Sequence, residues 1–350
     1  MNKKYFQKIT SIKLKSSNEK EEILENDYIF KVLVEKENII IISSKGLILI
    51  YKNINFKLIL SKNIIPHDYS YFDVKNFLKL EDDLFLISFG LIILFFKISL
   101  PEIKSIKYGY YYFDNMIKIK NDIFVCVEGH KGSDLPQLKL IEFKDKTKEK
   151  NKILEENFKG KEIDCFILDS FYKILQEYIC GHDESYKYPS NILYLKENEI
   201  VASFEHESSL IFIKIKNDKI FDKKNIKYIY IVNENKNLFL FFLKEKNYLL
   251  CGFEKGLFII DNLNKIIIKK LLAEYYVTCI NLLSNENIIL GAEDKEEISN
   301  LIEFNLENDK IIKIQGDITD YTLEEIIEVK NGTLLINSQS ESVEIWKQVG

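Results

Sequence analysis

The sequence predicts an all-β protein, a seven-bladed β-propeller that is closed by an N-terminal strand and carries a helical insertion between blades 3 and 4. Three observations predict this fold. A pair of short apolar runs joined by a polar turn recurs along the chain, at a spacing close to the length of one four-stranded blade. The last repeat lacks an outer strand, which the N-terminal run can supply.

Each recurring unit opens with a turn residue and continues through about four apolar, strand-favouring positions. A polar turn follows, and a second apolar run then ends in Lys, Asp or Asn. The intervals between neighbouring starts are 39 to 48 residues, except for one of 77 residues. A β-rich repeat of about 40–45 residues is typical of a propeller blade. The seven units begin at Asn38, Asp83, Asp122, Glu199, Asn247, Asn287 and Gly332.

The segments on either side of each pair fit the remaining two strands of a blade. Upstream runs alternate apolar and polar residues, as an inner strand packed between blades should. Downstream runs carry lysines among apolar residues, which suits an outer strand whose exposed edge must resist pairing with other chains. The upstream runs include those at Tyr28, Phe77, Val277 and Leu323, and the downstream runs those at Phe56, Ile103, Ile266 and Ile311.

The two ends of the chain complete each other in this interpretation. The last repeat ends at Trp346 and Gly350, which leaves no room for an outer strand. The N-terminal run from Phe6 to Leu14 precedes the first inner strand and has no repeat of its own. We therefore expect the N-terminal run to pair with the last repeat, because this closes the ring and removes an open edge.

The last repeat also contains Ser342-Val-Glu-Ile-Trp-Lys347, which resembles the third strand of a WD40 repeat, usually Thr-Val-Arg-Leu-Trp-Asp. Over nearly its whole length the chain resembles degenerate WD40 repeats, in which the Gly-His pair and the Trp-Asp dipeptide of the family are absent. The resemblance implies a propeller that presents its loops and rim to other proteins.

The 77-residue interval needs its own explanation. We expect a helical insertion over residues 160–187, because apolar residues from Asp164 to Cys180 recur at helical spacing. Asp164 can cap the start of this helix and Gly181 can end it. An eighth blade is the alternative. The apolar positions are Cys165, Phe166, Ile167, Phe171, Ile174, Leu175, Tyr178 and Ile179.

With 350 residues, 46% of them hydrophobic, the chain can bury the core of one large domain or of two smaller ones, and the repeats favour a single domain over residues 1–350. The net charge is −5, and all 49 basic residues are lysines. A nucleic-acid surface needs a basic patch, and arginine is the residue that grips phosphate with two parallel hydrogen bonds. We therefore expect no nucleic-acid partner.

The sequence also predicts a cytoplasmic, soluble protein. The N-terminus lacks the apolar core of a secretory signal, and the longest apolar run, residues 84–96, is too short to span a bilayer as a helix. The five cysteines are an odd number without a Cys-x-x-Cys motif, which indicates free thiols in a reducing compartment.

No motif for catalysis or cofactor binding occurs in the chain. The nucleophile elbow, the phosphate-binding glycine loop and the dinucleotide fingerprint are all absent. Cys180-Gly-His182 and Cys126-x-x-x-His130 do not have the spacing of a zinc site. We therefore predict a protein without catalytic residues, cofactor or metal.

Two features predict contact with partners. The turns inside the seven units carry more acidic residues than lysines, and this favours a partner with a basic segment, unless these turns are simply polar surface. These acidic residues include Glu128, Asp134, Glu205, Glu207, Glu254, Glu293, Asp294 and Glu296. The apolar face of the expected helix either packs on the propeller or docks on a partner. That face consists of Phe166, Phe171, Ile174 and Tyr178.

The sequence therefore predicts a non-catalytic protein–protein interaction scaffold that belongs to a larger hetero-complex. Its contact surfaces would be the acidic loop face and the insertion helix. One alternative is an enzyme whose active site lies at the mouth of the central channel, because propellers can assemble active sites from scattered loops. The other is a propeller of a membrane surface or a cargo coat.

Overall fold

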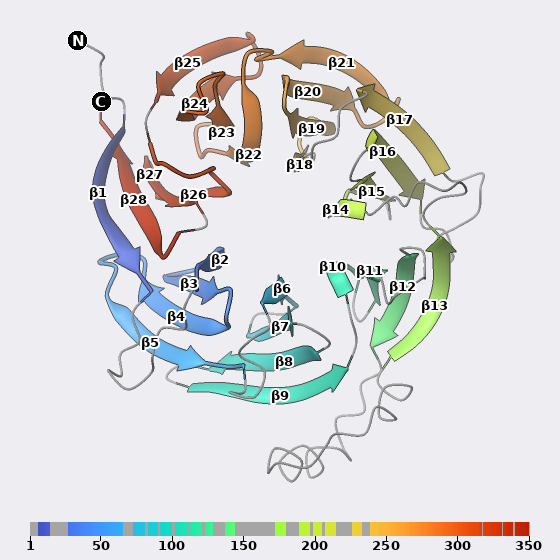
Figure 1. Ribbon diagram of the computed structural model, residues 1–350, viewed down its shortest axis with the longest axis vertical. Coiled ribbons are helices and arrows are strands. Elements are labelled where there is room, and N and C mark those ends of the chain that lie inside the picture. The colour runs from blue at the N-terminus through green and yellow to red at the C-terminus, as the bar shows by residue number, and fades with distance from the viewer. Residues whose placement is uncertain are drawn as a thin grey trace. The chain divides into compact units, whose positions relative to one another are not determined.

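The structure of the protein is a computed structural model, in which strands occur in most parts of the chain (Figure 1). The described residues contain 28 strands and no helix. The strands form seven antiparallel sheets of four strands each. The described ranges are 6–14, 27–65, 73–80, 83–89, 92–99, 102–110, 113–120, 123–128, 137–143, 172–179, 189–196, 199–204, 207–214, 226–232, 239–316, 318–330, 332–338 and 340–349.

The chain divides into two compact units. The first comprises residues 1–71 and 238–350, and the second comprises residues 72–237.

Four of the seven sheets lie in the first unit. One contains β2 (Ile29–Glu35), β3 (Asn38–Ser43), β4 (Leu47–Lys52) and β5 (Leu58–Asn63). The next contains β18 (Phe239–Leu243), β19 (Tyr248–Phe253), β20 (Gly256–Asp261) and β21 (Ile266–Leu271). A third contains β22 (Tyr276–Leu282), β23 (Ile288–Glu293), β24 (Ser299–Asn305) and β25 (Lys310–Gln315). The fourth joins β26 (Glu325–Lys330), β27 (Thr333–Asn337) and β28 (Ser342–Gln348) to β1 (Phe6–Lys13).

The second unit holds the other three sheets. The first contains β6 (Val74–Lys79), β7 (Leu84–Phe89), β8 (Ile92–Ser99) and β9 (Glu102–Tyr110). The second contains β10 (Phe113–Lys120), β11 (Ile123–Glu128), β12 (Gln137–Phe143) and β13 (Tyr172–Ile179). The third contains β14 (Pro189–Tyr194), β15 (Glu199–Phe204), β16 (Glu207–Lys214) and β17 (Ile226–Val232).

Within each unit, neighbouring sheets contact each other through the first strand of each sheet. In the first unit β18 contacts β22, β22 contacts β26, and β26 contacts β2. In the second unit β6 contacts β10, and β10 contacts β14. The strands that the sequence places upstream of each pair are therefore the inner ones, and they carry the contacts between neighbouring sheets.

The expected pairing of the two chain ends is confirmed. β1 is the outer strand of the last sheet and runs antiparallel to β28, with Phe6 opposite Gln348 and Ile12 opposite Val343 (Figure 1). The N-terminal strand thus covers an edge that β28 would otherwise expose.

Apolar side chains between successive sheets form the core of the first unit. Leu250, Ile259 and Leu290 lie in the cluster between the β18–β21 and β22–β25 sheets. Phe6 and Trp346 belong to the next cluster, which packs against residues of β23 and β24. Burying side chains of this size stabilises the fold by about 1.5–3 kcal/mol each. In this unit the apolar runs of the second and third strands are buried in the clusters between neighbouring sheets.

All seven outer strands share a local irregularity. Where each pairs with its neighbour, the register skips one residue of the outer strand, as a β-bulge does. A bulge bends and twists an edge strand, which discourages a further strand from pairing with it. In every case the skipped residue is apolar and branched. The seven are Ile9, Ile59, Ile106, Leu175, Ile231, Ile268 and Ile312.

The predicted helix is wrong over residues 172–179, which form the strand β13. This strand pairs with β12, placing Ile174 opposite Ile141 and Tyr178 opposite Leu138. It completes the sheet that β10 begins, so this part of the 77-residue interval is an outer strand. The rest of the expected insertion, residues 160–171 and 180–187, lies outside the described residues.

Candidate functional site

Four of the acidic residues predicted to bind a partner have described side chains, and all four belong to the first unit. Glu254 lies in the turn between β19 and β20. Glu293 ends β23, and Asp294 and Glu296 follow in the turn to β24. They therefore occupy corresponding turns of two neighbouring sheets, as the sequence repeat predicts.

Asp294 organises its own turn. Its Oδ1 accepts hydrogen bonds from the backbone amides of Glu296 at 2.9 Å and Ile298 at 3.1 Å. The bond from the Ile298 amide is the main cause that holds the pKa of Asp294 below its usual value. The carboxylate is therefore ionised at neutral pH, and the turn keeps its negative charge.

Negative charge extends beyond this turn. Glu293 accepts a hydrogen bond of 2.6 Å from the Thr322 hydroxyl, in the connection between β25 and β26. Burial raises the pKa of the nearby Tyr275 phenol, and the charges of Glu274 and Asp294 raise it further. The ends of these sheets thus carry a negative potential, although two of the carboxylates also have structural hydrogen bonds.

The other predicted contact residues that the structure describes belong to the second unit. Glu128 ends β11 and Glu207 begins β16, while Ile174 and Tyr178 lie in β13. Asp134, Glu205, Phe166 and Phe171 lie outside the described residues. The expected docking face on a helix is wrong for Ile174 and Tyr178, because both belong to a strand.

A pocket at the same end of the sheets was not predicted from the sequence. This cavity, which we call the Asp27 pocket, has a volume of about 610 Å³. The cavity lies beside the residues that precede β2 and beside the turn between β27 and β28. The lining residues are Lys13, Asp27, Tyr28, Tyr321, Ser340, Glu341 and Ser342.

Asp27 is a buried carboxyl group, with 6% of its surface exposed. Its Oδ1 accepts hydrogen bonds from the Ser44 hydroxyl at 2.9 Å and the Lys45 amide at 3.0 Å. Burial raises the pKa of Asp27, while the hydroxyls of Ser43 and Ser44 act in the opposite direction. Asp27 thereby ties the start of β2 to the turn between β3 and β4.

Backbone hydrogen bonds fix the opposite wall of the Asp27 pocket. The carbonyl of Ser340 accepts from the Ile29 amide at 3.0 Å, and that of Glu341 accepts from the Leu14 amide at 2.8 Å. The Ser340 hydroxyl donates to the Ser342 carbonyl at 2.8 Å. The wall is therefore held in place by two separate segments of the chain.

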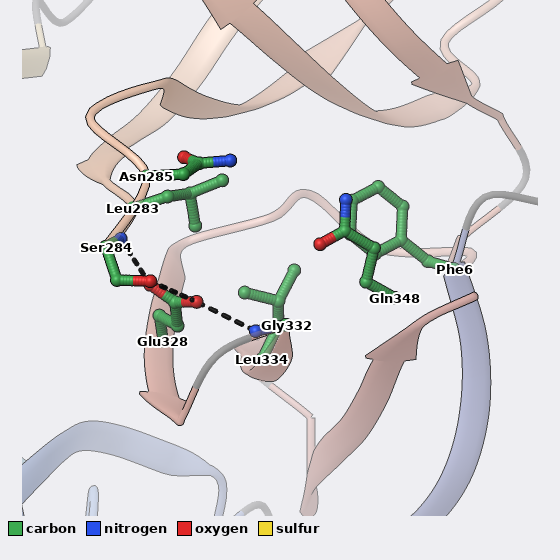
Figure 2. A pocket seen from close by; sticks show the side chains of 8 residues that line it. All are labelled: Phe6, Leu283, Ser284, Asn285, Glu328, Gly332, Leu334 and Gln348. Atoms are coloured by element: carbon green, nitrogen blue, oxygen red, sulfur yellow. Dashed lines mark hydrogen bonds between the residues drawn. The ribbon is translucent and has the colours of Figure 1, made fainter. Parts of the chain in front are cut away.

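A second pocket, the Glu328 pocket, lies between the turn joining β22 to β23 and the turn joining β26 to β27 (Figure 2). Its volume is about 410 Å³. Figure 2 shows Glu328 reaching both turns, while Phe6 and Gln348 form the opposite side. The lining residues are Phe6, Leu283, Ser284, Asn285, Glu328, Gly332, Leu334 and Gln348.

Beside the Glu328 pocket, Glu303 is a buried carboxylate that is already saturated by protein groups. Asn285 and Asn287 donate side-chain hydrogen bonds to its Oε1 at 3.1 and 2.8 Å. Its Oε2 accepts from Gln348 at 3.4 Å and lies 3.5 Å from the ammonium of Lys313. Burying a carboxyl group is costly unless it is hydrogen-bonded and paired, and these partners meet that need, so this network is structural.

Sequence reasoning missed Asp27, Tyr321 and Glu328. Asp27 is a single acidic residue ahead of an inner strand, and Glu328 occupies a polar position of another inner strand. Asp27 bonds to Ser44, 17 residues further along the chain, and Glu328 bonds to Ser284 of the neighbouring sheet, so no short motif could have indicated them. Within the described ranges, no three His, Cys, Asp or Glu residues are grouped as a metal site would require. No described residue belongs to a helix long and apolar enough to cross a membrane.

Comparison with solved structures decides the fold. The chain is similar to the crystal structure of the Cps50 (Swd1) β-propeller domain of Myceliophteria thermophila, with a TM-score of 0.61. The similarity covers 92% of this chain and 98% of that domain. The fold is a β-propeller. The sequence identity is 9%, so the likeness concerns the fold alone. The expected propeller is confirmed, and the resemblance to degenerate WD40 repeats is consistent with it. No family model and no curated protein matches this propeller's sequence.

Proposed function

We propose that this propeller is a non-catalytic protein–protein interaction scaffold in the cytoplasm, a subunit of a larger hetero-complex. The observation that carries the proposal is a set of exposed aliphatic side chains on the outer strands β21 and β25 of two neighbouring sheets and in the turn that precedes β21. We call this set the isoleucine surface. It consists of Leu263, Ile266, Ile267, Ile268, Ile311, Ile312 and Ile314.

The isoleucine surface is unusual for its degree of exposure. The exposed fraction is 52% for Ile266 and 42% for Ile312, and it reaches 78% for Leu263. The strands β21 and β25 have the same order of exposed and half-buried positions. Side chains that lie together in this way expose apolar area to water, and covering that area favours association with another molecule.

The two strands of this surface are linked to each other. Lys269 of β21 forms an ion pair with Asp309, which immediately precedes β25, at 2.7 Å. Bulges at Ile268 and Ile312 discourage an added strand. We therefore propose that the partner is bound through these side chains, without a strand added to the sheet.

The acidic turns supply a second contact region in this proposal. We propose that Glu254, Glu293, Asp294 and Glu296 attract a partner with a basic segment, together with Glu128, Asp134, Glu205 and Glu207 of the second unit. The negative charge near Tyr275 supports this role, since complementary charge speeds association and selects partners.

The experiment is affinity capture of the tagged protein from its native cell extract, with quantification of co-purifying proteins. The variant Ile266→Ser/Ile312→Ser reduces the isoleucine surface, and Ile54→Ser is the matched control because Ile54 is 65% exposed outside it. We expect a stoichiometric partner with wild type and with the control, and its loss with the double variant. Absence of any stoichiometric partner would contradict the scaffold function.

A further inference from the structure

The Asp27 pocket combines chemical groups that a cation can use. Asp27 supplies a buried carboxylate, and Glu341 supplies an exposed carboxylate on the facing turn. The rings of Tyr28 and Tyr321 also line the cavity, and 59% of Tyr321 is exposed. Aromatic rings attract ammonium groups, and hydroxyls such as that of Ser340 accept their hydrogen bonds.

The same groups argue against other kinds of ligand. An anion would meet two carboxylates, Asp27 and Glu341, against one lining lysine, Lys13, and an apolar group would make no use of these charges. Protein sites for metal ions are commonly built from several carboxylate, imidazole or thiolate groups, and the described residues contain no group of three His, Cys, Asp or Glu. The volume of about 610 Å³ suits a side chain with part of its backbone.

We infer that the Asp27 pocket binds the side-chain ammonium group of a lysine in a basic segment of a partner protein. This inference rests on the proposed scaffold function and names the partner chemistry for its acidic face. The lysine would contact the rings of Tyr28 and Tyr321 and the carboxylate of Glu341, which all line the cavity. Its charge would compensate that of the buried carboxylate, and the segment around it would lie along the acidic turns.

Two groups of the protein itself act at the pocket. Lys13 lines the cavity and competes with an entering ammonium group, and Asp27 also holds the turn between β3 and β4 through its hydrogen bonds. The experiment must therefore separate ligand binding from both.

The probe is a fluorescein-labelled decapeptide in which three lysines are spaced by glycine and serine, and the measurement is fluorescence anisotropy at low and at physiological salt. Matched peptides replace lysine by Nε-acetyllysine or by glutamate. We expect binding of the lysine peptide alone, and weaker binding as the salt concentration rises.

The variant Asp27→Asn keeps an oxygen that can accept from Ser44 and Lys45 but removes the charge. We expect it to weaken binding about tenfold, as the loss of a charged hydrogen bond does. Glu307→Gln is the matched control, because it removes one exposed charge outside the pocket. Tyr321→Ala, at an exposed position, should also weaken binding and tests the pocket if Asp27→Asn does not fold. Lys13→Gln should strengthen binding.

Equal affinity of wild type, Asp27→Asn and Tyr321→Ala would overturn the inference, and so would equal binding of the acetyllysine peptide. Failure of the inference is distinguishable from failure of the scaffold function. If capture of a partner depends on the isoleucine surface while no lysine peptide binds, the scaffold stands and the lysine pocket is wrong. If no stoichiometric partner is captured, the scaffold is wrong whatever the peptide does.

Discussion

The carboxylate of Glu328 accepts hydrogen bonds from both the backbone amide and the hydroxyl of Ser284, at 2.5 and 3.1 Å (Figure 2). It also accepts from the Gly332 amide at 2.9 Å. A single side chain of β26 thus joins the turn of its own sheet to the turn of the neighbouring sheet. Glu328 therefore takes the place of water as the hydrogen-bond acceptor for a backbone amide in each of the two turns.

Replacing Glu328 by Ala should destabilise the protein. We expect the free energy of unfolding to fall by about 1–3 kcal/mol, because three hydrogen bonds to a charged group are lost. Ser284→Ala is the control, since it removes the hydroxyl and keeps the amide, and it should cost about 0.5–1 kcal/mol. Urea unfolding measures both. A larger loss for Ser284→Ala than for Glu328→Ala would contradict this assignment.

Gly256→Ala should be strongly destabilising. Gly256 has a φ of +107°, and a Cβ atom there would collide with the carbonyl oxygens of Leu271 and Leu272. We expect a loss of more than about 2 kcal/mol from backbone strain and overlap. At Gly332, φ is +74° and the nearest atom to an added Cβ is 3.1 Å away. Gly332→Ala is therefore the milder control, at about 1 kcal/mol. Thermal unfolding of both variants provides the comparison.

Asp27 should make stability depend on pH in an unusual direction. Burial raises its pKa in the folded protein above the ordinary value of 3.8, so the folded state binds the proton more tightly than the unfolded state. Its contribution to stability therefore falls as the pH rises from the unfolded pKa through the folded pKa. Wild type should lose stability relative to Asp27→Asn over that range, and chemical unfolding at a series of pH values measures the difference.

Asp294 gives the control for this pH dependence because its pKa is lowered in the folded protein. The stability that it contributes should be present above its unfolded pKa and lost as the pH falls through the folded value. The difference between wild type and Asp294→Asn should therefore slope in the opposite sense. Equal slopes for the two variants would contradict the assigned environments.

The thiols of Cys251 and Cys279 should be unreactive in the folded protein. Both are free and buried, and burial raises the pKa of Cys279 to about 12 and that of Cys251 well above its usual range. Reagents attack the thiolate, so modification should follow unfolding. The test uses a variant with Cys126, Cys165 and Cys180 replaced by Ser. Rapid labelling under native conditions would show that one of the two remaining thiols is accessible.

The repeating pattern allowed much of the fold to be predicted, because the physics of each strand is local. Runs such as Ile39–Ile42 and Leu47–Ile50 are apolar throughout and bounded by turn residues, so they form buried strands wherever a neighbouring sheet covers them. The pairing of Phe6–Lys13 with the last repeat was predictable for a different reason. The last repeat lacked an outer strand, and the N-terminal strand belonged to no repeat.

The prediction failed at Tyr172–Ile179, where a short apolar run fits both a helix and a strand. Its side chains recur at helical spacing, yet β12 presents an edge that needs a partner, and backbone hydrogen bonds along that edge decide the outcome. The spacing of apolar residues within 172–179 contains no information on the open edge of β12, because a separate segment of the chain forms that edge.

The sequence alone determined the strand pattern and the acidic character of the turns, since these depend on residues close together in the chain. It also determined the closing strand, because the last repeat lacks an outer strand. Only the tertiary structure decided which carboxylates are buried and what they contact. Asp27 meets Ser44 at a separation of 17 residues, and Glu328 meets Ser284 at a separation of 44 residues, beyond the reach of any local pattern. The two pockets exist for the same reason. A cavity is shaped by side chains from several strands, and its position follows from packing that no single strand encodes.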